Sequence, residues 1–265
     1  MLAAQRQAHI LEQVRRNGGV RVTDLTLEFG VSDMTIRRDL DALARRHLVE
    51  KVHGGATAAA PGSAEEPGFE TKATHAQAEK EAIAAAASRL VYPGAAIGLS
   101  AGTTTWRLAH RLRDIPDITV VTNSIRIAEV FHHAPRADQT VVLTGGVRTP
   151  SDALVGPIAV SALHSLNLDL VVVGAHGMDE RAGFTTPNLL EADTDRALVT
   201  AGRRLVVVAD HTKWGVVGIS TFADLGEADV VTDAGLAEQA QRLLEERAGE
   251  LIVVPVGDPG HEEAS

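Results

Sequence analysis

The chain has 265 residues, of which 45% are hydrophobic and 23% charged, and it contains no cysteine. A chain of this length and composition can bury a large core, and we expect one small and one larger domain. The lack of cysteine excludes disulfides and thiolate metal sites. The first twenty residues have no apolar signal-peptide core, and no apolar run reaches the ~18 to 20 residues that span a bilayer. We therefore expect a cytoplasmic protein with no membrane partner.

The net charge of −10 is unevenly distributed along the chain. Residues 1–56 contain nine Lys or Arg against seven Asp or Glu, a net charge of +2. The rest contains sixteen against twenty-eight, a net charge of −12. Charge of +2 gives only a modest attraction to DNA, because each phosphate contact contributes through counterion release. If the first part binds DNA, we expect a homo-oligomer, a dimer or a tetramer, that reads repeated half-sites.

The first 57 residues predict a small helical domain. Residues 2–17 form the opening helix, and residues 22–29 form a second helix with a Thr23 cap, which Gly30 ends in a left-handed conformation. Ser32 then caps a third helix, in which the apolar side chains share one face. These apolar residues are Ile36, Leu40 and Leu43.

The second and third helices, joined by the glycine turn, have the helix-turn-helix pattern. The polar face of the third helix can enter the major groove, where Arg binds guanine or phosphate and Thr binds phosphate or a thymine methyl. The alternative is an ordinary amphipathic helix pair with a solvated charged face. Under the DNA-binding interpretation, the contacts are Ser32, Met34, Thr35, Arg37, Arg38 and Arg45, with His53 in the segment that follows.

That following segment, residues 48–56, has β-type residues and ends in a glycine pair, as expected of a wing hairpin. With it, the chain strongly resembles the DeoR family of bacterial transcriptional regulators. The resemblance implies a winged helix-turn-helix domain at residues 1–57 that binds double-stranded operator DNA. The matching residues are Arg6, Ile10, Leu11, Val22, Leu25, Val31-Ser32, Thr35-Ile36-Arg37-Arg38-Asp39-Leu40, Leu43 and His53-Gly54-Gly55-Ala56.

A second domain is expected at residues 69–255, after a linker at 58–68 rich in Ala, Pro, Gly, Ser and Glu. Residues 69–93 are expected to contain a long Ala-rich helix, and strands, loops and helices alternate beyond it. The strands are near-continuous apolar runs, as in sheets covered on both faces. We expect an α/β domain with a mainly parallel, Rossmann-like sheet and a flexible tail at 256–265. The predicted strands are 95–99, 118–122, 140–144, 168–174, 205–209, 230–232 and 251–254.

Ligands in such sheets bind past the carboxyl ends of the strands, where four loops carry polar residues. In the first loop, Gly102 and three threonines suit a phosphate at a helix N-terminus, although a plain Thr cap explains them equally well. Polar residues of the second and third loops serve turns or caps when taken singly. Together with the fourth loop they favour a site for a small polyol phosphate. The candidate effector contacts are Gly102, Thr103, Thr104, Thr105, Asn123, Gly145, Gly146, Arg148, Asp210 and Lys213.

The loops also match the DeoR family, whose sensor domain resembles ribose-5-phosphate isomerase. The resemblance implies a repressor of a carbohydrate-metabolism operon that responds to a phosphorylated sugar or polyol. The chain departs from the family at Ser100-Ala101, where an acid often stands, and at Asp195, where Lys is common. The matching residues are Lys80, Gly102-Thr103-Thr104, Val121-Thr122-Asn123-Ser124, Gly145-Gly146, Asp169, Gly174, Gly177, Gly183, Glu191-Ala192, Arg196-Ala197, Asp210, Lys213 and Gly215.

The alternative function is a sugar-phosphate isomerase with an accessory DNA-binding domain. Such chemistry needs a carboxylate base beside the sugar and a cation that stabilises the enediolate. Residues 174–178 and 184–189 stand where these isomerases carry their acids and lysine, and they lack both. We therefore expect no catalytic residues. His132-His133 has no third ligand at a metal-site spacing, so we expect neither a metal nor a cofactor.

Overall fold

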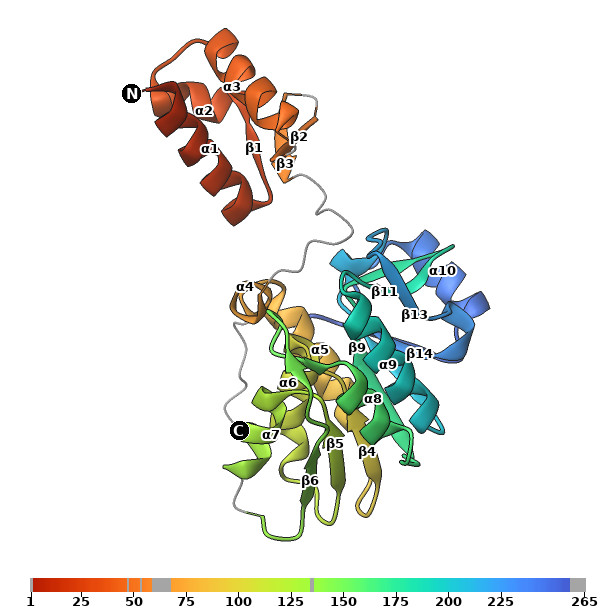
Figure 1. Ribbon diagram of the computed structural model, residues 1–265. Coiled ribbons are helices and arrows are strands. Elements are labelled where there is room, and N and C mark those ends of the chain that lie inside the picture. The colour runs from red at the N-terminus through yellow and green to blue at the C-terminus, as the bar shows by residue number, and fades with distance from the viewer. Residues whose placement is uncertain (1, 47, 53, 59–67, 134–135, 258–265) are drawn as a thin grey trace, which may run out of the picture. The chain divides into compact units, whose positions relative to one another are not determined.

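The chain forms two compact units, residues 1–62 and 63–265. None of the helices in the described part of the chain is both long and apolar enough to cross a membrane. A computed structural model describes residues 2–46, 48–52, 54–58, 68–133 and 136–257 (Figure 1).

The first unit packs its helices around a small core and carries a three-stranded antiparallel sheet of order β1-β3-β2. The wing hairpin, strands β2 and β3, is confirmed. Strand β1 was not predicted; it pairs with β3 and so ties the hairpin to the helices. The elements are α1 (Ala3–Asn17), β1 (Gly19–Arg21), α2 (Val22–Phe29), α3 (Asp33–Arg45), β2 (Val49–Val52) and β3 (Gly55–Ala58).

Local signals explain most of these boundaries. Ser32 caps α3 by accepting a hydrogen bond from the Thr35 amide at 3.3 Å, and Gly30 ends α2 with a φ of 61°. The predicted Thr23 cap is wrong, because α2 already begins at Val22 and its N-cap makes no side-chain bond. In the wing, a Cβ on Gly55 would lie 2.0 Å from a β1 carbonyl oxygen, so only glycine fits there.

The second unit is built on a seven-stranded sheet in which every neighbouring pair is parallel, with the order β15-β14-β12-β9-β4-β5-β6. All seven predicted strands are present and belong to this one sheet, so the predicted α/β fold is confirmed. The strands are β4 (Ala96–Leu99), β5 (Thr119–Thr122), β6 (Thr140–Leu143), β9 (Leu170–Gly174), β12 (Leu205–Val208), β14 (Asp229–Asp233) and β15 (Leu251–Val254).

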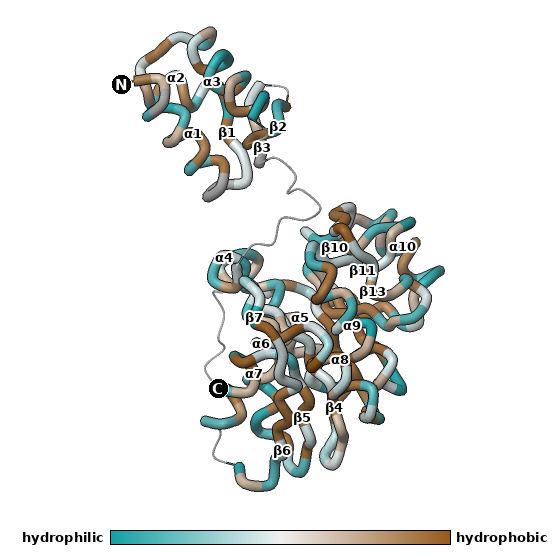
Figure 2. Tube along the Cα trace, viewed as in Figure 1, coloured by the Kyte–Doolittle hydropathy of each residue, from teal (hydrophilic) through white to brown (hydrophobic). Residues whose placement is uncertain are grey.

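Helices cover both faces of this sheet. Helices α5, α6 and α7 pack on one face, and α8, α9 and α10 pack on the other. Hydrophobic residues run along the strands between the two helical layers (Figure 2). The helices are α4 (Phe69–Ala73), α5 (Gln77–Ser88), α6 (Thr103–Leu112), α7 (Ile125–His132), α8 (Pro157–Leu163), α9 (Leu189–Ala201) and α10 (Glu238–Arg247), with short 3-10 turns η1 (His211–Lys213) and η2 (Leu225–Glu227).

Two smaller sheets were not predicted, because their strands are either two or three residues long or, as in β11 and β13, mix polar with apolar residues. One is antiparallel with the order β10-β11-β13, and the other pairs β7 with β8. Their strands are β7 (Val147–Arg148), β8 (Leu154–Val155), β10 (Gly177–Asp179), β11 (Gly183–Thr186) and β13 (Ser220–Ala223).

The Ala-rich helix predicted within residues 69–93 is confirmed as α5, and a shorter helix, α4, which was not predicted, precedes it. The chain turns between them at Ala76, whose φ is 49°. Lys80 stabilises this turn, since its ammonium donates to the carbonyl oxygens of Lys72 and His75 at 2.6 and 2.7 Å. The buried Lys80 therefore holds the turn that separates α4 from the Ala-rich helix α5.

The strand order decides where a ligand can bind. From β4 the chain builds the sheet outward through β5 and β6, and it then returns to the other side of β4 for β9, β12, β14 and β15. The topological switch point thus lies between β4 and β9, and open α/β sheets bind ligands at the carboxyl ends of strands at such a point.

Candidate functional site

Helix α3 presents the polar face that the sequence predicts. Its apolar residues Ile36, Leu40 and Leu43 are at most 1% exposed, in the core of the first unit. On the other side, Met34 is 64% exposed, and Arg38 and Arg45 are exposed as well. The helix therefore has the division between a packed and a free side that a recognition helix needs.

The charges on this face are not equally available. The Arg37 guanidinium pairs with Asp33 one turn earlier, and Lys51 of the wing pairs with Asp41 at 2.5 Å. Within the described part of the chain, Arg38 makes no hydrogen bond or ion pair. Of the two adjacent arginines, Arg38 is thus the one whose guanidinium has no partner among the described residues. His53 lies outside the described residues.

An ion pair inside the first unit holds α3 in place. Arg6 of α1 donates from Nε to a carboxylate oxygen of Asp39 at 2.5 Å, and Gln7 donates to the other oxygen at 2.9 Å. Arg6 and Asp39 are only 7% and 4% exposed. Both oxygens of Asp39 are therefore satisfied by α1, which fixes the orientation of the recognition helix.

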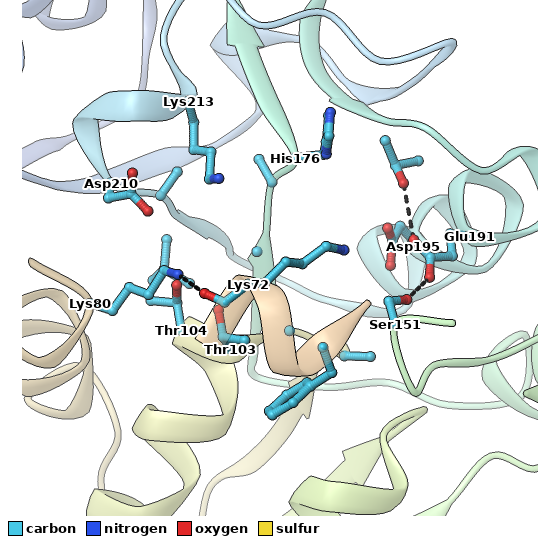
Figure 3. Close-up of a pocket in the computed structure, with 18 of the residues that line it drawn as sticks. Lys72, Lys80, Thr103, Thr104, Ser151, His176, Glu191, Asp195, Asp210 and Lys213 are labelled. Carbon is cyan, nitrogen blue, oxygen red and sulfur yellow. Dashed lines mark hydrogen bonds between the residues drawn. The ribbon is translucent and has the colours of Figure 1, made fainter. Parts of the chain in front are cut away.

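The second unit has a pocket at the switch point, lined by residues that follow β4, β9 and β12. One end of it is cationic on balance, since Lys80 and Lys213 lie there with the single carboxylate of Asp210 (Figure 3). There the hydroxyls of Thr103 and Thr104 lie at the N-terminus of α6, beside Lys80 and near Lys213. Backbone amides, the positive end of the helix dipole, hydroxyls and ammonium groups are the partners that a phosphate group prefers.

Lys80 is the buried cation of this end. It is 3% exposed, and burial lowers the pKa of its ammonium to about 8, although the nearby Asp210 carboxylate acts in the opposite direction. Asp210 is itself buried and caps η1 by accepting from the Thr212 amide at 3.1 Å. At neutral pH the Lys80 ammonium is protonated, but little pH change is needed to neutralise it.

The opposite end of the pocket is acidic (Figure 3). Glu191 and Asp195 lie one turn apart on α9, and Glu191 accepts hydrogen bonds from Thr149 at 3.0 Å, from Thr186 at 3.1 Å and from Ser151. Asp195 is 8% exposed, and burial together with the charge of Glu191 raises the pKa of its carboxyl well above the ordinary value.

Five of the predicted effector contacts line this pocket: Gly102, Thr103, Thr104, Asp210 and Lys213.

The other predicted contacts lie elsewhere. Thr105 is fully buried and donates to the Gly102 carbonyl at 3.1 Å. Asn123 accepts from the Ala101 amide at 2.8 Å and donates to the Leu154 carbonyl at 3.3 Å, so it fixes the loop after β4. Arg148 pairs with Asp152 at 2.5 Å. These residues, like Gly145 and Gly146, are absent from the pocket lining within the described part of the chain.

Their position follows from local contacts and not from strand order alone. Asn123 follows β5, and Gly145, Gly146 and Arg148 follow or belong to the segment after β6. Ser151, from that same segment, does line the pocket. Asn123 is instead engaged by the loop after β4, and Arg148 by Asp152.

The residue-by-residue reasoning missed much of the pocket. Lys80 and Glu191 match the DeoR family, but no local pattern in the sequence marks them as effector contacts. Lys72 comes from α4, whose packing against α6 has no sequence signal. The polar or charged lining residues that were not predicted as contacts are Lys72, Lys80, Ser151, His176, Thr186, Glu191 and Asp195.

No group of three or more potential metal ligands is found among the described residues. Of the acids near the segments that match the isomerases, Asp179 accepts from the amides of Arg181 and Ala182 at 2.9 Å each and so closes a turn. Glu191, also near these segments, lines the pocket and accepts hydrogen bonds from three hydroxyls.

Two family patterns match the chain. A DeoR-like helix-turn-helix domain matches residues 6–61, and a DeoR C-terminal sensor domain matches residues 75–234, which is more than half of the chain. The chain belongs to the DeoR family. It is accordingly a DNA-binding transcriptional regulator, with its helix-turn-helix in the first unit and its sensor domain in the second.

Relatives within the DeoR family align over nearly their whole length. The uncharacterised HTH-type regulator YgbI of Escherichia coli is 38% identical over 256 residues, which is 96% of this chain and 98% of YgbI. The HTH-type regulator GlpR of Haloferax volcanii is 36% identical over 96% of this chain and 98% of its own. The glycerol-3-phosphate regulon repressor of Escherichia coli is 31% identical over 88% of this chain and 92% of the repressor.

Solved structures of ribose-5-phosphate isomerases align only in part. One, in complex with phospho-erythronic acid, is 18% identical with a TM-score of 0.38, over 51% of this chain and 52% of the isomerase. The chain thus spans about half the length of that enzyme, and the likeness carries no argument about activity.

Proposed function

We propose that this DeoR-family protein represses a carbohydrate-metabolism operon and that a phosphorylated sugar or polyol, bound in the pocket of the sensor domain, changes its affinity for the operator. The observation that carries the proposal is the cationic end of the pocket. The hydroxyls of Thr103 and Thr104 at the start of α6, with the ammonium groups of Lys80 and Lys213, offer what a phosphate needs.

The rest of the pocket supports a hydroxylated ligand. Carboxyl groups and hydroxyls line the opposite end, and they hydrogen-bond readily to the hydroxyls of a sugar or polyol. The name of one relative, the glycerol-3-phosphate regulon repressor, points to a metabolite of the same class. A ligand with a phosphate at one end and hydroxyls along its length would contact both ends at once.

We further propose that the protein binds its operator as a homo-oligomer. Residues 1–56 carry a net charge of only +2, so one helix-turn-helix unit has few cations with which to displace counterions. Two units held together reach adjacent half-sites and multiply their affinities.

The experiment is a thermal-shift panel of sugar phosphates, polyol phosphates and the corresponding free sugars, followed by anisotropy measurements on fluorescent promoter DNA with and without each hit. We expect one phosphorylated compound to stabilise the protein and to change promoter affinity, while its free sugar does neither. A coupling of ~1 to 3 kcal/mol between the two sites is typical of such regulators.

The matched control is the double variant Thr103→Ala with Thr104→Ala. It should weaken binding of the phosphorylated hit and leave the promoter affinity of the ligand-free protein unchanged, since neither threonine lies in the DNA-binding unit. A hit that binds the double variant as tightly as the wild type would contradict the proposed phosphate site. Consumption of the hit by the wild-type protein would instead support the isomerase alternative.

A further inference from the structure

The pocket has two chemically different ends, and the proposed phosphate site accounts for only one of them. Asp195 lies at the other end, away from Thr103, Thr104 and Lys80 (Figure 3). Its side chain lines the pocket although it is more than nine-tenths buried. Among the hydrogen bonds of the described residues, none involves its carboxyl group.

We propose that Asp195 determines the specificity of the sensor by binding a terminal hydroxyl of the effector, so that the effector is a phosphorylated polyol or neutral sugar and not a phosphorylated sugar acid. This inference rests on the proposed function, because it assumes that the phosphate occupies the opposite end of the pocket.

The charges that face Asp195 explain why this end of the pocket should prefer a hydroxyl of the effector to a carboxylate. On its own helix, Glu191 is an acid one turn away. Arg196 donates to Asp193 and to the Thr221 carbonyl, at 2.5 Å each. From α4, Lys72 extends toward this end, and Arg196 and Lys72 are the two cations that act on Asp195. A carboxylate on the effector would thus enter a site that already holds Glu191.

The burial of Asp195 favours its protonated form. Burial and the neighbouring Glu191 both raise the pKa of this carboxyl, which is therefore neutral at pH values where an ordinary aspartate is ionised. A neutral carboxyl has one O–H donor and a carbonyl acceptor, and an alcohol also has one donor and two acceptor lone pairs. The two groups can exchange two hydrogen bonds without burying any charge.

The test compares pairs of phosphate esters that differ only at the carbon farthest from the phosphate. Glycerol 3-phosphate and 3-phosphoglycerate form the three-carbon pair, and erythritol 4-phosphate and 4-phosphoerythronate form the four-carbon pair. Calorimetry at pH 7 gives the ratio of dissociation constants within each pair. For the pair that binds more tightly, we expect the wild type to prefer the alcohol by roughly tenfold or more, the effect of leaving one buried polar group unmatched.

Two substitutions at matched positions separate a local role of Asp195 from a general charge effect. Asp195→Lys places an ammonium where the effector carbon ends, so the preference should move toward the acid ester. Asp193→Lys makes the same change two residues away, on a side chain that is 57% exposed and paired with Arg196, so the ratio should stay as in the wild type. Equal ratios in both variants would overturn the proposal.

Asp195→Asn tests the proposal even if the lysine variant misfolds. Its amide has nearly the shape of the carboxyl and still donates and accepts hydrogen bonds. The Asp195→Asn variant should keep the preference for the alcohol ester.

In the wild type, affinity for the alcohol ester should fall as pH rises, because Asp195 ionises and Lys80 loses its proton. In the Asp195→Asn variant, only the loss of affinity due to Lys80 should remain. An identical pH profile in both proteins contradicts the proposal.

Binding of inorganic phosphate and of the ester pairs to the wild type separates the role of Asp195 from the proposed phosphate site. If inorganic phosphate and both ester pairs fail to bind the wild type, the proposed phosphate site is wrong and the inference falls with it. If phosphate binds and the wild type takes the acid and alcohol esters equally, the inference alone is wrong.

Discussion

At the scale of single residues, Arg37 and Arg38 are adjacent arginines with different surroundings. Arg37 is held by Asp33, whereas Arg38 extends from α3 without a partner among the described residues. We therefore expect Arg38→Ala to reduce operator affinity by ~1 to 3 kcal/mol, as for an arginine that contacts a base or phosphate. Arg37→Ala should have a smaller effect, because its charge is already compensated. Anisotropy titrations over a range of salt concentrations measure both, and a larger loss for Arg37→Ala would contradict this assignment.

Lys80 gives the effector site a pH dependence. Because burial lowers its pKa to about 8 in the free protein, and a bound phosphate dianion favours the charged ammonium, the pKa of Lys80 must rise when the effector binds. Binding then takes up protons near and above pH 8, and effector affinity falls as pH rises through this range. Calorimetry from pH 6.5 to 9.5 tests this, with Lys80→Arg as the control that keeps its charge and should flatten the profile.

At the scale of elements, α4 is the first described helix after the segment that joins the two units, and it also forms part of the pocket wall. Phe69 anchors it between the Trp106 ring, at a centroid distance of 5.9 Å, and the Arg126 guanidinium, 4.1 Å above the ring. Lys80 holds its carboxyl end. We therefore expect the effector to act on the DNA-binding unit by a route through α4.

We expect Phe69→Ala to loosen α4 and to reduce both effector affinity and the change in operator affinity that the effector causes. The operator affinity of the ligand-free protein should stay the same. Phe222→Ala is the matched control, because Phe222 is equally buried but packs against Phe184 and not on the pocket. Anisotropy titrations with and without effector give the coupling, and a full coupling in Phe69→Ala would exclude this route.

The contact between α1 and α3 should dominate the stability of the first unit. Asp39→Ala leaves the Arg6 guanidinium buried without its partner, and breaking a buried pair in this way costs ~3 to 5 kcal/mol. Asp41→Ala removes an exposed carboxylate that pairs with Lys51, so its effect on unfolding should lie within the error of the measurement. Urea unfolding followed by far-UV circular dichroism compares the two. Equal midpoints would show that the buried pair is not needed.

At the scale of the whole molecule, the uneven charge leads to a prediction about assembly. Because one DNA-binding unit carries a net charge of only +2, a duplex with a single half-site should bind weakly, and a duplex with two half-sites one or more helical turns apart should bind far more tightly. Sedimentation of the protein with each duplex gives the number of chains bound. Equal affinity for both duplexes, with one chain on each, would contradict the proposed homo-oligomer.

The sequence by itself determined the elements whose signals are local. Ser32 and Gly30 mark the two sides of the helix-turn-helix, and the seven apolar runs mark the strands of the sheet, because caps, glycine turns and continuous burial each leave a pattern within a few residues. The phosphate-type loop at Gly102 was predicted for the same reason, since its backbone and hydroxyls lie together in the chain.

Only the tertiary structure decided which of these pieces form one site. Asn123 and Arg148 look equivalent to Asp210 in sequence, yet Asn123 is engaged by the Ala101 amide and Arg148 by Asp152, outside the pocket lining among the described residues. Lys80 and Asp195 enter the pocket from two helices, α5 and α9, which lie on opposite faces of the sheet. Strand order and helix packing depend on contacts between residues far apart in the chain, so no local pattern records them.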